Sequence, residues 1–571
     1  MMKKEKNDIY VLSTILLTWV TWMVIVTSLL FLFGIKIGWY NIALATLFTT
    51  IFIYLKCKEV CSFKVLVSAL AIVIICILFS GVNYDTTYDG ACYHKQAVGL
   101  LKEGWNPVYY SAQEYNMISQ SIPSEIIEKA ENALTWAETY PKASWYFASC
   151  IYFMTNNIES GKAYNVLFIL ILFGISYSKF YVFFNSKWKA LIASTAIALN
   201  PIALDQIQCY YVDGACACIL MALMIELVSV IEQEWENIEG IDKLNIILLI
   251  IWGCNLKFSI TLFTGIFCIA FFIFRALKKR EKLAETFKYF LYTAIFSGVI
   301  VGFAPYMTNI IRYHNVLAGY TLIDTSDSAI NEYFGISGLN RVERSLCSLF
   351  GKMSHGQYHS VKELIKIPFT IEPTELNYYM IPDTRVSAFG VWFSGIFVIS
   401  IVICIMFFVR KRKLLNDREK LTIVFVSITL IELFAFTTSY QMRYVPHLYF
   451  ITIMALVILL NVEMNKKVLK KFMVAMLFAA MIFNVYPWIK RIYIKQSSGI
   501  ETHEELRLLA THEQPVIAFH AYDFNGMHYN LKDCGIDNYV YVDKETLNSE
   551  YKDVYSTYEN WVFYTYDTLK D

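Results

Sequence analysis

The stretch "FKVLVSALAIVIICILFSGVNYDTTYDGACYH", residues 63–94, decides the fold class. Its first part, 63–82, is predominantly apolar and is as long as the roughly 20 residues that a helix needs to cross a bilayer. Its second part places two acids four residues apart, Asp85 and Asp89, ahead of a Tyr-His pair. The stretch therefore predicts a membrane-spanning helix that leads into a polar, aromatic loop.

The composition is typical of a membrane protein. Of the 571 residues, 57% are hydrophobic and 17% are charged, whereas soluble proteins carry about 25% charged residues. This deficit of charge indicates that much of the surface faces lipid. The formal net charge of +1 gives no support for nucleic-acid binding, so membrane lipid and no nucleic acid is the expected environment.

Apolar segments recur along most of the chain. They predict an α-helical polytopic membrane protein with about 13 transmembrane helices. The candidate spans are residues 10–34, 38–55, 63–82, 162–184, 189–204, 212–231, 244–256, 258–276, 288–305, 386–409, 420–437, 446–461 and 468–488. The apolar segment "ASWYFASCIYFMT" (143–155) is too short to span, and we expect it to lie on or dip into the outer leaflet.

Basic residues set the predicted orientation. With the N-terminus in the cytoplasm, every basic cluster falls on the inner side, as the positive-inside rule requires. The clusters are "MMKKEKN" (1–7), "KCKEVCSFK" (56–64), "NSKWK" (185–189), "RALKKREK" (275–282), "VRKRKLLNDREK" (409–420) and "NKKVLKK" (465–471). The protein is therefore expected to be a multi-pass protein of the cytoplasmic (plasma) membrane, with outer loops at 83–161 and 306–385 and an outer C-terminal region.

The C-terminal region, 491–571, is expected to form a small extracytoplasmic α/β domain. "ETHEELRLLATH" (501–512) has helical periodicity, and "PVIAF" (515–519), "YVYV" (539–542) and "NWVFYTY" (560–566) have the composition of strands. It has no glycine-rich phosphate loop, and we interpret it as a structural cap.

Two acids follow the span at 63–82. A carboxylate at the membrane boundary can act as a general base, and two carboxylates can hold a divalent cation such as Mg²⁺ or Mn²⁺. Alternatively, Asp85 and Asp89 only mark where the chain enters water. The density of Asp, Tyr, His and Trp around them favours a functional role, although the sequence makes no cofactor certain.

Further polar side chains lie at the same predicted boundary. Cations that could hold a lipid phosphate are Lys142 in "TYPKASWY" (139–146), Lys257 in "CNLKFS" (254–259), Arg312 in "APYMTNIIRYHN" (304–315) and Arg443 in "SYQMRYVPHLYF" (439–450). Lys142 could instead be a snorkelling anchor and Arg312 a surface charge. Side chains suited to sugar hydroxyls are Gln206, Tyr210, Tyr211 and Asp213 in "NPIALDQIQCYYVDGA" (200–215), although Asp213 could simply cap a helix. Asp383 and Arg385 in "YYMIPDTRVSAFG" (378–390) could pair with each other.

An ordered set of motifs resembles the bacterial GT-C glycosyltransferases. These are polytopic enzymes related to the protein O-mannosyltransferases and the lipid A aminoarabinose transferase. The matching motifs are "DGACYH", "YPKASWY", "NPIALDQIQCYYVDG", "NLKFS", "PYMTN", "PDTRVSAFG" and "RYVPHLYF". The resemblance implies a GT-C-like module over residues 62–490. The chain departs from the pattern in an additional pair of spans at 1–61 and in carrying Asp85 beside Asp89.

The resemblance implies an inverting transfer of a sugar from a polyprenyl-phosphate donor to an envelope acceptor, which is a glycan, lipid or protein. Asp89 is then the catalytic base, because its spacing to the Tyr-His pair matches the family motif, and Asp85 orients the acceptor or helps to bind a metal. The expected phosphate-binding residues are Lys257, Arg443, Lys142 and Arg312. The expected substrate-binding residues are Tyr93, His94, Gln206, Tyr210, Tyr211, Asp213, Asp383 and Arg385.

Three alternatives stay open at this point. Arginines in the loop 306–385 also suit a polysaccharide polymerase or ligase that uses a lipid-linked donor. Acids within spans, Glu226 and Glu432, are the feature that a lipid or glycan transporter (flippase) would use. The third alternative is a non-catalytic scaffold in envelope assembly.

Overall fold

Helices of very different length make up most of the structure, which is a computed structural model. It describes residues 8–57, 61–122, 127–322, 335–353, 358–380, 382, 385–436, 438, 440–463, 466–511, 516–520, 525–536, 539–542, 545, 549, 554–557 and 562–565.

The elements before residue 323 are helical. They are α1 (Asp8–Leu32), α2 (Trp39–Phe52), the π-helix η1 (Ile53–Cys57), α3 (Phe63–Val82), the π-helix η2 (Gly90–His94), α4 (Lys95–Glu103), α5 (Ala112–Ser119), α6 (Ile127–Thr139), α7 (Ala143–Thr155), η4 (Ile158–Lys162), α8 (Ala163–Phe184), α9 (Lys187–Ala198), α10 (Pro201–Asp205), α11 (Asp213–Val230), η5 (Trp235–Asn237), α12 (Gly240–Leu256), α13 (Phe258–Leu277), α14 (Leu283–Ile295), η6 (Phe296–Val301), η7 (Phe303–Met307), α15 (Thr308–Tyr313) and α16 (Ala318–Leu322).

The later elements are helices followed by short strands. They are α18 (Arg341–Phe350), α19 (Val361–Leu364), α20 (Pro373–Tyr378), α21 (Phe393–Lys411), α22 (Asp417–Ala435), η8 (Met442–Tyr444), η9 (Pro446–Tyr449), α23 (Phe450–Asn461), α24 (Lys467–Ala510), β1 (Val516–His520), η10 (Asn525–Met527), α25 (His528–Asp533), β2 (Tyr539–Tyr541), β3 (Tyr555–Thr557) and β4 (Val562–Thr565).

Each predicted apolar segment overlaps a helix, so the predicted α-helical polytopic class is confirmed. Among the described residues, 7 helices are long and apolar enough to cross a membrane, or 8 if Leu283–Val301 and Phe303–Tyr313, bent by 76°, form one span. The figure of about 13 spans stays a prediction. The short segment 143–155 forms α7 with the expected bounds, and most of its side chains are buried within the protein.

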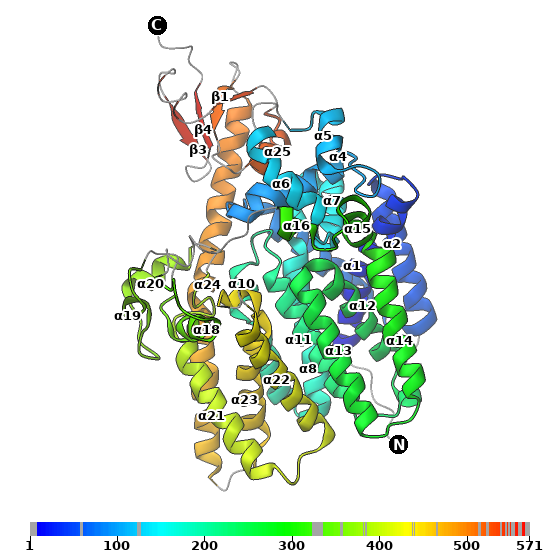
Figure 1. Ribbon diagram of the computed structural model, residues 1–571, viewed down its shortest axis with the longest axis vertical. Coiled ribbons are helices and arrows are strands. Elements are labelled where there is room, and N and C mark those ends of the chain that lie inside the picture. The colour runs from blue at the N-terminus through cyan, green and yellow to red at the C-terminus, as the bar shows by residue number, and fades with distance from the viewer. Residues whose placement is uncertain are drawn as a thin grey trace.

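The two ends of the helical bundle differ in what they carry (Figure 1). The start of α1 and the connections after α13 and α21 lie at one end, together with the basic residues of those two connections. Helices α4–α6 and the C-terminal strands lie at the opposite end. This one-sided distribution agrees with the arrangement of loops that the basic residues predict.

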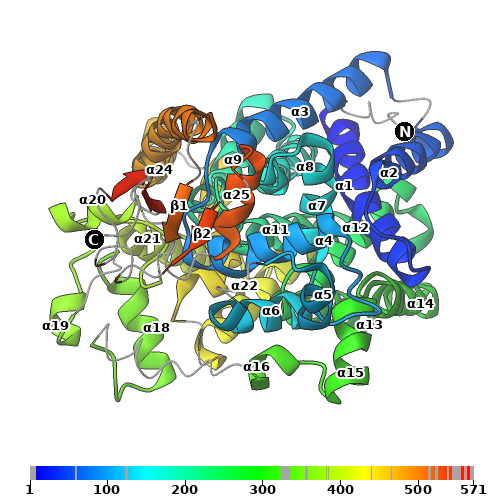
Figure 2. The same ribbon diagram turned by 90° about the horizontal axis from the view of Figure 1, so that it is seen from above.

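Helix α11 lies at the centre of the bundle. The most apolar 18 residues of α11 are 89% buried, against 22% for those of α3, so α11 is enclosed by protein while α3 borders the lipid. Helices α8, α12 and α13 pack against α11, and Figure 2 shows it surrounded when the bundle is seen from above. A side chain at either end of α11 is therefore held in a fixed place.

Helix α24 links the bundle to the C-terminal sheet. It has 44 residues, which corresponds to about 66 Å at 1.5 Å per residue and far exceeds the roughly 30 Å of a bilayer core. Its last turns therefore extend beyond the bundle, as Figure 1 shows. The strands have the order β2-β1-β4-β3, with β1 parallel to β2 and the other pairs antiparallel.

Three of these strands overlap the segments that the sequence assigns to strands, and β3 was not predicted. The predicted boundary at 491 falls inside α24, and an autonomous C-terminal domain stays a prediction.

Gly499 lets α24 pack directly on the chain at the end of α3. A Cβ atom at this position would lie 2.2 Å from the carbonyl oxygen of Val82. We expect Gly499→Ala to lower the free energy of unfolding by about 1–3 kcal/mol, as overpacking does, and thermal unfolding of the purified protein measures this. Gly265→Ala is the control, because a Cβ there meets nothing within 4 Å. Equal melting temperatures for the two variants would contradict the packing.

Candidate functional site

Asp213, the first residue of α11, is the centre of a polar cluster at the end that carries α4–α6. Its Oδ1 lies 2.5 Å from the Nζ of Lys257, and its Oδ2 accepts a hydrogen bond of 3.1 Å from Gln206 Nε2. Arg443 Nη1 lies 3.9 Å from the same Oδ2. Gln206 Oε1 in turn accepts from the Gly214 N–H at 2.8 Å. Asp213, beyond any helix-capping role, thus faces a side chain of its own loop and two cations from distant parts of the sequence.

Asp89 extends this cluster toward the solvent. Its Oδ2 lies 3.9 Å from Arg443 Nη2, and its backbone N–H donates to the Tyr211 hydroxyl at 3.4 Å. The Asp89 side chain is 26% exposed, whereas those of Asp213 and Arg443 are 3% and 6% exposed. Asp89 is therefore the carboxylate of this cluster that a substrate can reach most readily.

Asp85 holds the loop that carries Asp89. Its Oδ1 accepts from the backbone N–H and the hydroxyl of Thr87 at 2.9 and 2.7 Å, and its Oδ2 accepts from the Tyr210 N–H at 2.7 Å. Asp85 is 1% exposed. The next turn needs Gly90, because a Cβ there would lie 2.0 Å from Asp85 Oδ2. The two acids therefore differ in environment: Asp85 is buried and stabilises the loop, whereas Asp89 is partly exposed and accessible to a substrate.

Aromatic rings enclose the two cations. The guanidinium of Arg443 lies 4.8 Å from the Tyr211 ring centroid and 5.2 Å from that of Tyr444, and Lys257 Nζ lies 4.0 Å from that of Tyr444. Rings at such distances attract a cation and restrict its position. Tyr93 adds a further aromatic group, with ring centroids 6.0 Å and 6.3 Å from those of Trp136 and Tyr140.

His94 packs against the ring of Tyr93. It is buried, and its Nδ1 accepts a hydrogen bond of 2.7 Å from Trp145 Nε1. Burial lowers the pKa of His94 to about 3, so the ring is neutral at physiological pH. Its ring lies 4.3 Å from that of Tyr93. His94 thus packs behind Tyr93 and carries no charge toward a phosphate.

The structure places other predicted site residues elsewhere. Lys142 is buried and donates to the carbonyl oxygens of Glu138 and Tyr140 at 2.6 and 2.8 Å. Arg312 donates to Glu138 Oε1 at 3.1 Å. These contacts do not bring either cation to Asp213.

The remaining predicted site residues are Tyr210, Arg385 and Asp383. Tyr210 is buried and its hydroxyl donates to the Ile158 carbonyl oxygen. Arg385 is partly buried. Asp383 lies outside the described residues.

The contacts of the acids also bear on the predicted metal. Within the described ranges, no group of three or more His, Cys, Asp or Glu side chains could hold a metal ion. Both carboxylate oxygens of Asp85 accept hydrogen bonds from the protein, and Asp89 faces Arg443. A divalent cation stays a prediction from the sequence.

A buried ionic cluster that the sequence did not reveal lies next to the Asp85 loop. Glu159 pairs with Lys95 and Lys162 at 2.5 Å each, and Lys95 Nζ also donates to the Asp85 carbonyl oxygen at 2.8 Å. Asn530 of α25 accepts from Lys95 Nζ at 2.8 Å and donates to Glu159 Oε1 at 2.8 Å. The C-terminal segment is therefore part of the support of the Asp89 loop. The one sequence signal for this cluster is the spacing of Glu159 and Lys162, three residues apart.

A second support lies behind Arg443. His447 Nε2 lies 2.7 Å from Glu432 Oε2, and both side chains are buried. Asn200 Nδ2 donates to the Pro446 carbonyl oxygen at 3.1 Å. These contacts hold the short helices η8 and η9, which present Arg443 to the two aspartates.

Comparisons with known proteins give few relatives. No family model and no curated protein matches the chain. Among solved structures, ArnT from Cupriavidus metallidurans bound to undecaprenyl phosphate is similar, with a TM-score of 0.47 and 10% identity over 88% of this chain and 98% of that one. The apo form of the same protein has a TM-score of 0.42 and 10% identity over 82% and 84%. Both TM-scores are below 0.5, so neither likeness assigns a function to this chain.

Asp533 makes the attachment of α25 dependent on pH. Its carboxylate accepts from the Tyr152 hydroxyl at 2.6 Å and from the Ile158 N–H at 2.7 Å. Burial raises its pKa from 3.8 to about 6. Because the folded-state pKa is the higher one, this group's contribution to stability is greatest below about pH 4, falls as the pH rises to about 6 and is constant above.

We therefore expect the melting temperature to fall between pH 5 and pH 7.5, and to fall less in Asp533→Asn, which keeps one acceptor oxygen. Differential scanning fluorimetry at the two pH values measures both. The same fall in the variant as in the wild type would show that Asp533 does not titrate in this range.

Proposed function

We propose that the chain is an inverting glycosyltransferase that moves a sugar from a polyprenyl-phosphate donor to an acceptor hydroxyl of the cell envelope, which is a glycan, a lipid or a protein. One observation carries this proposal. The guanidinium of Arg443 lies between two carboxylates, 3.9 Å from the partly exposed Asp89 and 3.9 Å from the buried Asp213, which pairs with Lys257. A base and two cations within one cluster are what transfer from a phosphate requires.

The depth of this cluster favours a lipid-linked donor. Asp213 begins a helix that is apolar enough to span a membrane, and Lys257 immediately precedes another. The cluster therefore lies where helices leave the hydrocarbon core, which is also where lipid phosphates lie. A polyprenyl phosphate in the membrane would present its phosphate at this level.

In the proposed reaction, Asp89 accepts the proton of the acceptor hydroxyl while that oxygen attacks the anomeric carbon. The bond between the anomeric carbon and the phosphate oxygen breaks, and its electron pair leaves with the lipid phosphate. The product is a glycoside with inverted configuration. The proton remains on Asp89 until solvent removes it, so one carboxylate completes the cycle.

Arg443 and Lys257 are proposed to hold the leaving phosphate. Arg443 lies 3.9 Å from each aspartate, its Nη2 donates to the Tyr444 hydroxyl at 3.4 Å, and its planar fork has the geometry that phosphate oxygens match. Lys257 is bound more tightly, at 2.5 Å from Asp213, and contributes mainly a fixed positive charge. Tyr93 and Trp136 are proposed to contact the sugar, because both side chains are partly exposed and their ring centroids lie 6.0 Å apart.

No described contact favours the alternatives over this proposal. Arg341 donates to the Ala435 carbonyl oxygen at 2.7 Å and Arg312 pairs with Glu138, so both arginines have structural partners. Glu226 pairs with Lys179 at 2.9 Å, and Glu432 with His447. Transfer of radiolabel from a polyprenyl-phosphate sugar distinguishes a polymerase, ligase or flippase from the proposed enzyme. Only the proposed enzyme moves single sugars to a small acceptor and releases the lipid phosphate.

Asp89→Asn is expected to slow transfer by at least about 100-fold, because a positioned base contributes roughly 10²–10⁴-fold. The assay follows radiolabel leaving a panel of polyprenyl-phosphate hexoses in proteoliposomes. Glu501→Gln, which changes an exposed acid of α24, is the control and should retain the wild-type rate. A rate for Asp89→Asn within a few fold of wild type, in folded protein, would exclude Asp89 as the base.

Arg443→Lys keeps the charge and removes the planar fork. We expect the KM for the donor to rise about tenfold, as loss of one charge-assisted hydrogen bond does, with the acceptor KM little changed. Arg341→Lys is the matched control, since Arg341 is exposed and bonds only a main-chain oxygen among the contacts described. Equal effects on both KM values would argue against phosphate binding by Arg443.

A further inference from the structure

A crevice lies at the opposite end of the bundle from Asp89. It has a volume of about 150 Å³ and is lined by residues of α8, α11, α21, α22 and α23. On α11 the lining starts at Ile225, 12 residues after Asp213, which places it about 18 Å farther along the helix. The crevice is therefore separate from the proposed transfer site.

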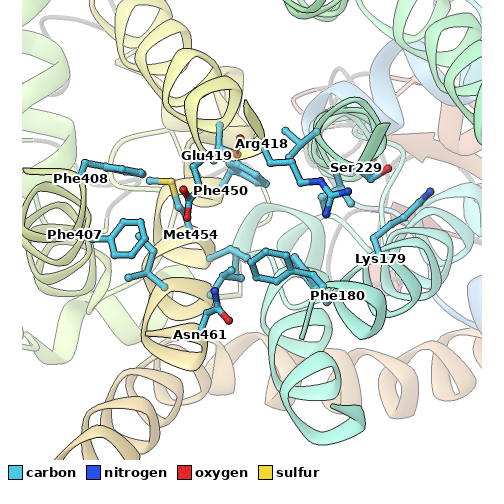
Figure 3. Close-up of a pocket in the computed structure, with 17 residues that line it drawn as sticks. Lys179, Phe180, Ser229, Phe407, Phe408, Arg418, Glu419, Phe450, Met454 and Asn461 are labelled. Atoms are coloured by element: carbon cyan, nitrogen blue, oxygen red, sulfur yellow. Dashed lines mark hydrogen bonds between the residues drawn. The ribbon is translucent and has the colours of Figure 1, made fainter. Parts of the chain in front are cut away.

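The walls of the crevice are almost entirely apolar. Phe180, Phe407 and Phe450 come from three different helices, and Met454 adds a flexible side chain (Figure 3). On α23 the lining extends from Phe450 to Asn461, about 16 Å, which is half of a bilayer core of roughly 30 Å. These dimensions match the acyl region of a single leaflet.

Polar side chains gather at one end of the crevice. Lys179 is neutralised by Glu226 and Asp242, at 2.9 Å from each. Arg418 makes one ion pair, from its Nε to Glu232 Oε2 at 3.1 Å. Its two terminal amino groups have no partner among the residues that the structure describes, and Figure 3 shows its guanidinium beside the apolar space.

The surroundings of Arg418 are strongly basic. The segment 410–420 contains six basic and two acidic residues. Both acids are paired, Asp417 with Lys278 and Glu419 with Lys411. The exposed side chains of Arg410, Arg412 and Lys413 have no ion pair within the described part of the chain. A ligand at this end of the crevice thus meets a surplus of positive charge.

We propose that this crevice binds one anionic phospholipid, with an acyl chain among the phenylalanines and its phosphate at Arg418. The apolar walls at membrane depth select a lipid chain, and the basic end selects an anionic headgroup. The site would tie the α21–α23 helices to the α8–α11 pair through a lipid of the leaflet on the N-terminal side. It is independent of the proposed transfer reaction.

Native mass spectrometry of the purified full chain with phosphatidylglycerol or phosphatidylcholine tests the proposal. We expect one phosphatidylglycerol retained per chain with about tenfold or higher preference over phosphatidylcholine, and a loss of about tenfold in Arg418→Gln. Val457→Trp, which fills the crevice, should also displace the lipid. Lys279→Gln, an exposed cation of another loop at the same end, should retain it.

Three results would overturn the proposal. They are equal retention of the two lipids, unchanged retention in both Arg418→Gln and Val457→Trp, and displacement of phosphatidylglycerol by undecaprenyl phosphate, which would assign the crevice to the tail of a donor. Asp89→Asn should retain the lipid as the wild type does, so that failure of the transferase proposal and failure of the lipid site can be distinguished.

Discussion

The convergence of two cations on the Asp213 carboxylate is the interaction on which the rest of the site depends. Asp213 begins the most enclosed of the spanning helices, so its position is set by the packing of the whole bundle. Lys257 and Arg443 are nearly buried, and buried charges are stable only when they are paired. Asp213 therefore fixes the positions of both cations, and Arg443 in turn lies 3.9 Å from Asp89.

The Asp89 loop is held from its other side by a second set of buried charges. Glu159 satisfies Lys95 and Lys162, and Asn530 from the C-terminal segment completes the set. Removal of one partner from such a cluster is strongly destabilising, because it leaves an uncompensated charge in the interior. The C-terminal segment is thus more than an external cap, since it contributes to the rigidity of the loop that presents Asp89.

The sequence predicted the helical class and the positions of the helices well, because an apolar segment of sufficient length is a local signal. It also selected Asp89, Lys257, Arg443, Gln206, Tyr211 and Asp213, which the structure brings together. It could not separate Asp85 from Asp89 by environment, since that difference depends on the Tyr210 N–H, more than one hundred residues away. Lys142 and Arg312 looked equivalent to Lys257 because their shared partner, Glu138, is evident only in three dimensions.

The stereochemistry of the transfer tests the central claim most directly. If Asp89 activates the acceptor while Arg443 and Lys257 hold the leaving phosphate, the sugar moves in a single displacement. NMR spectroscopy of the product, made from a donor of known anomeric configuration, should then show the opposite configuration. Retention of configuration would exclude a single in-line displacement and would contradict the role assigned to Asp89.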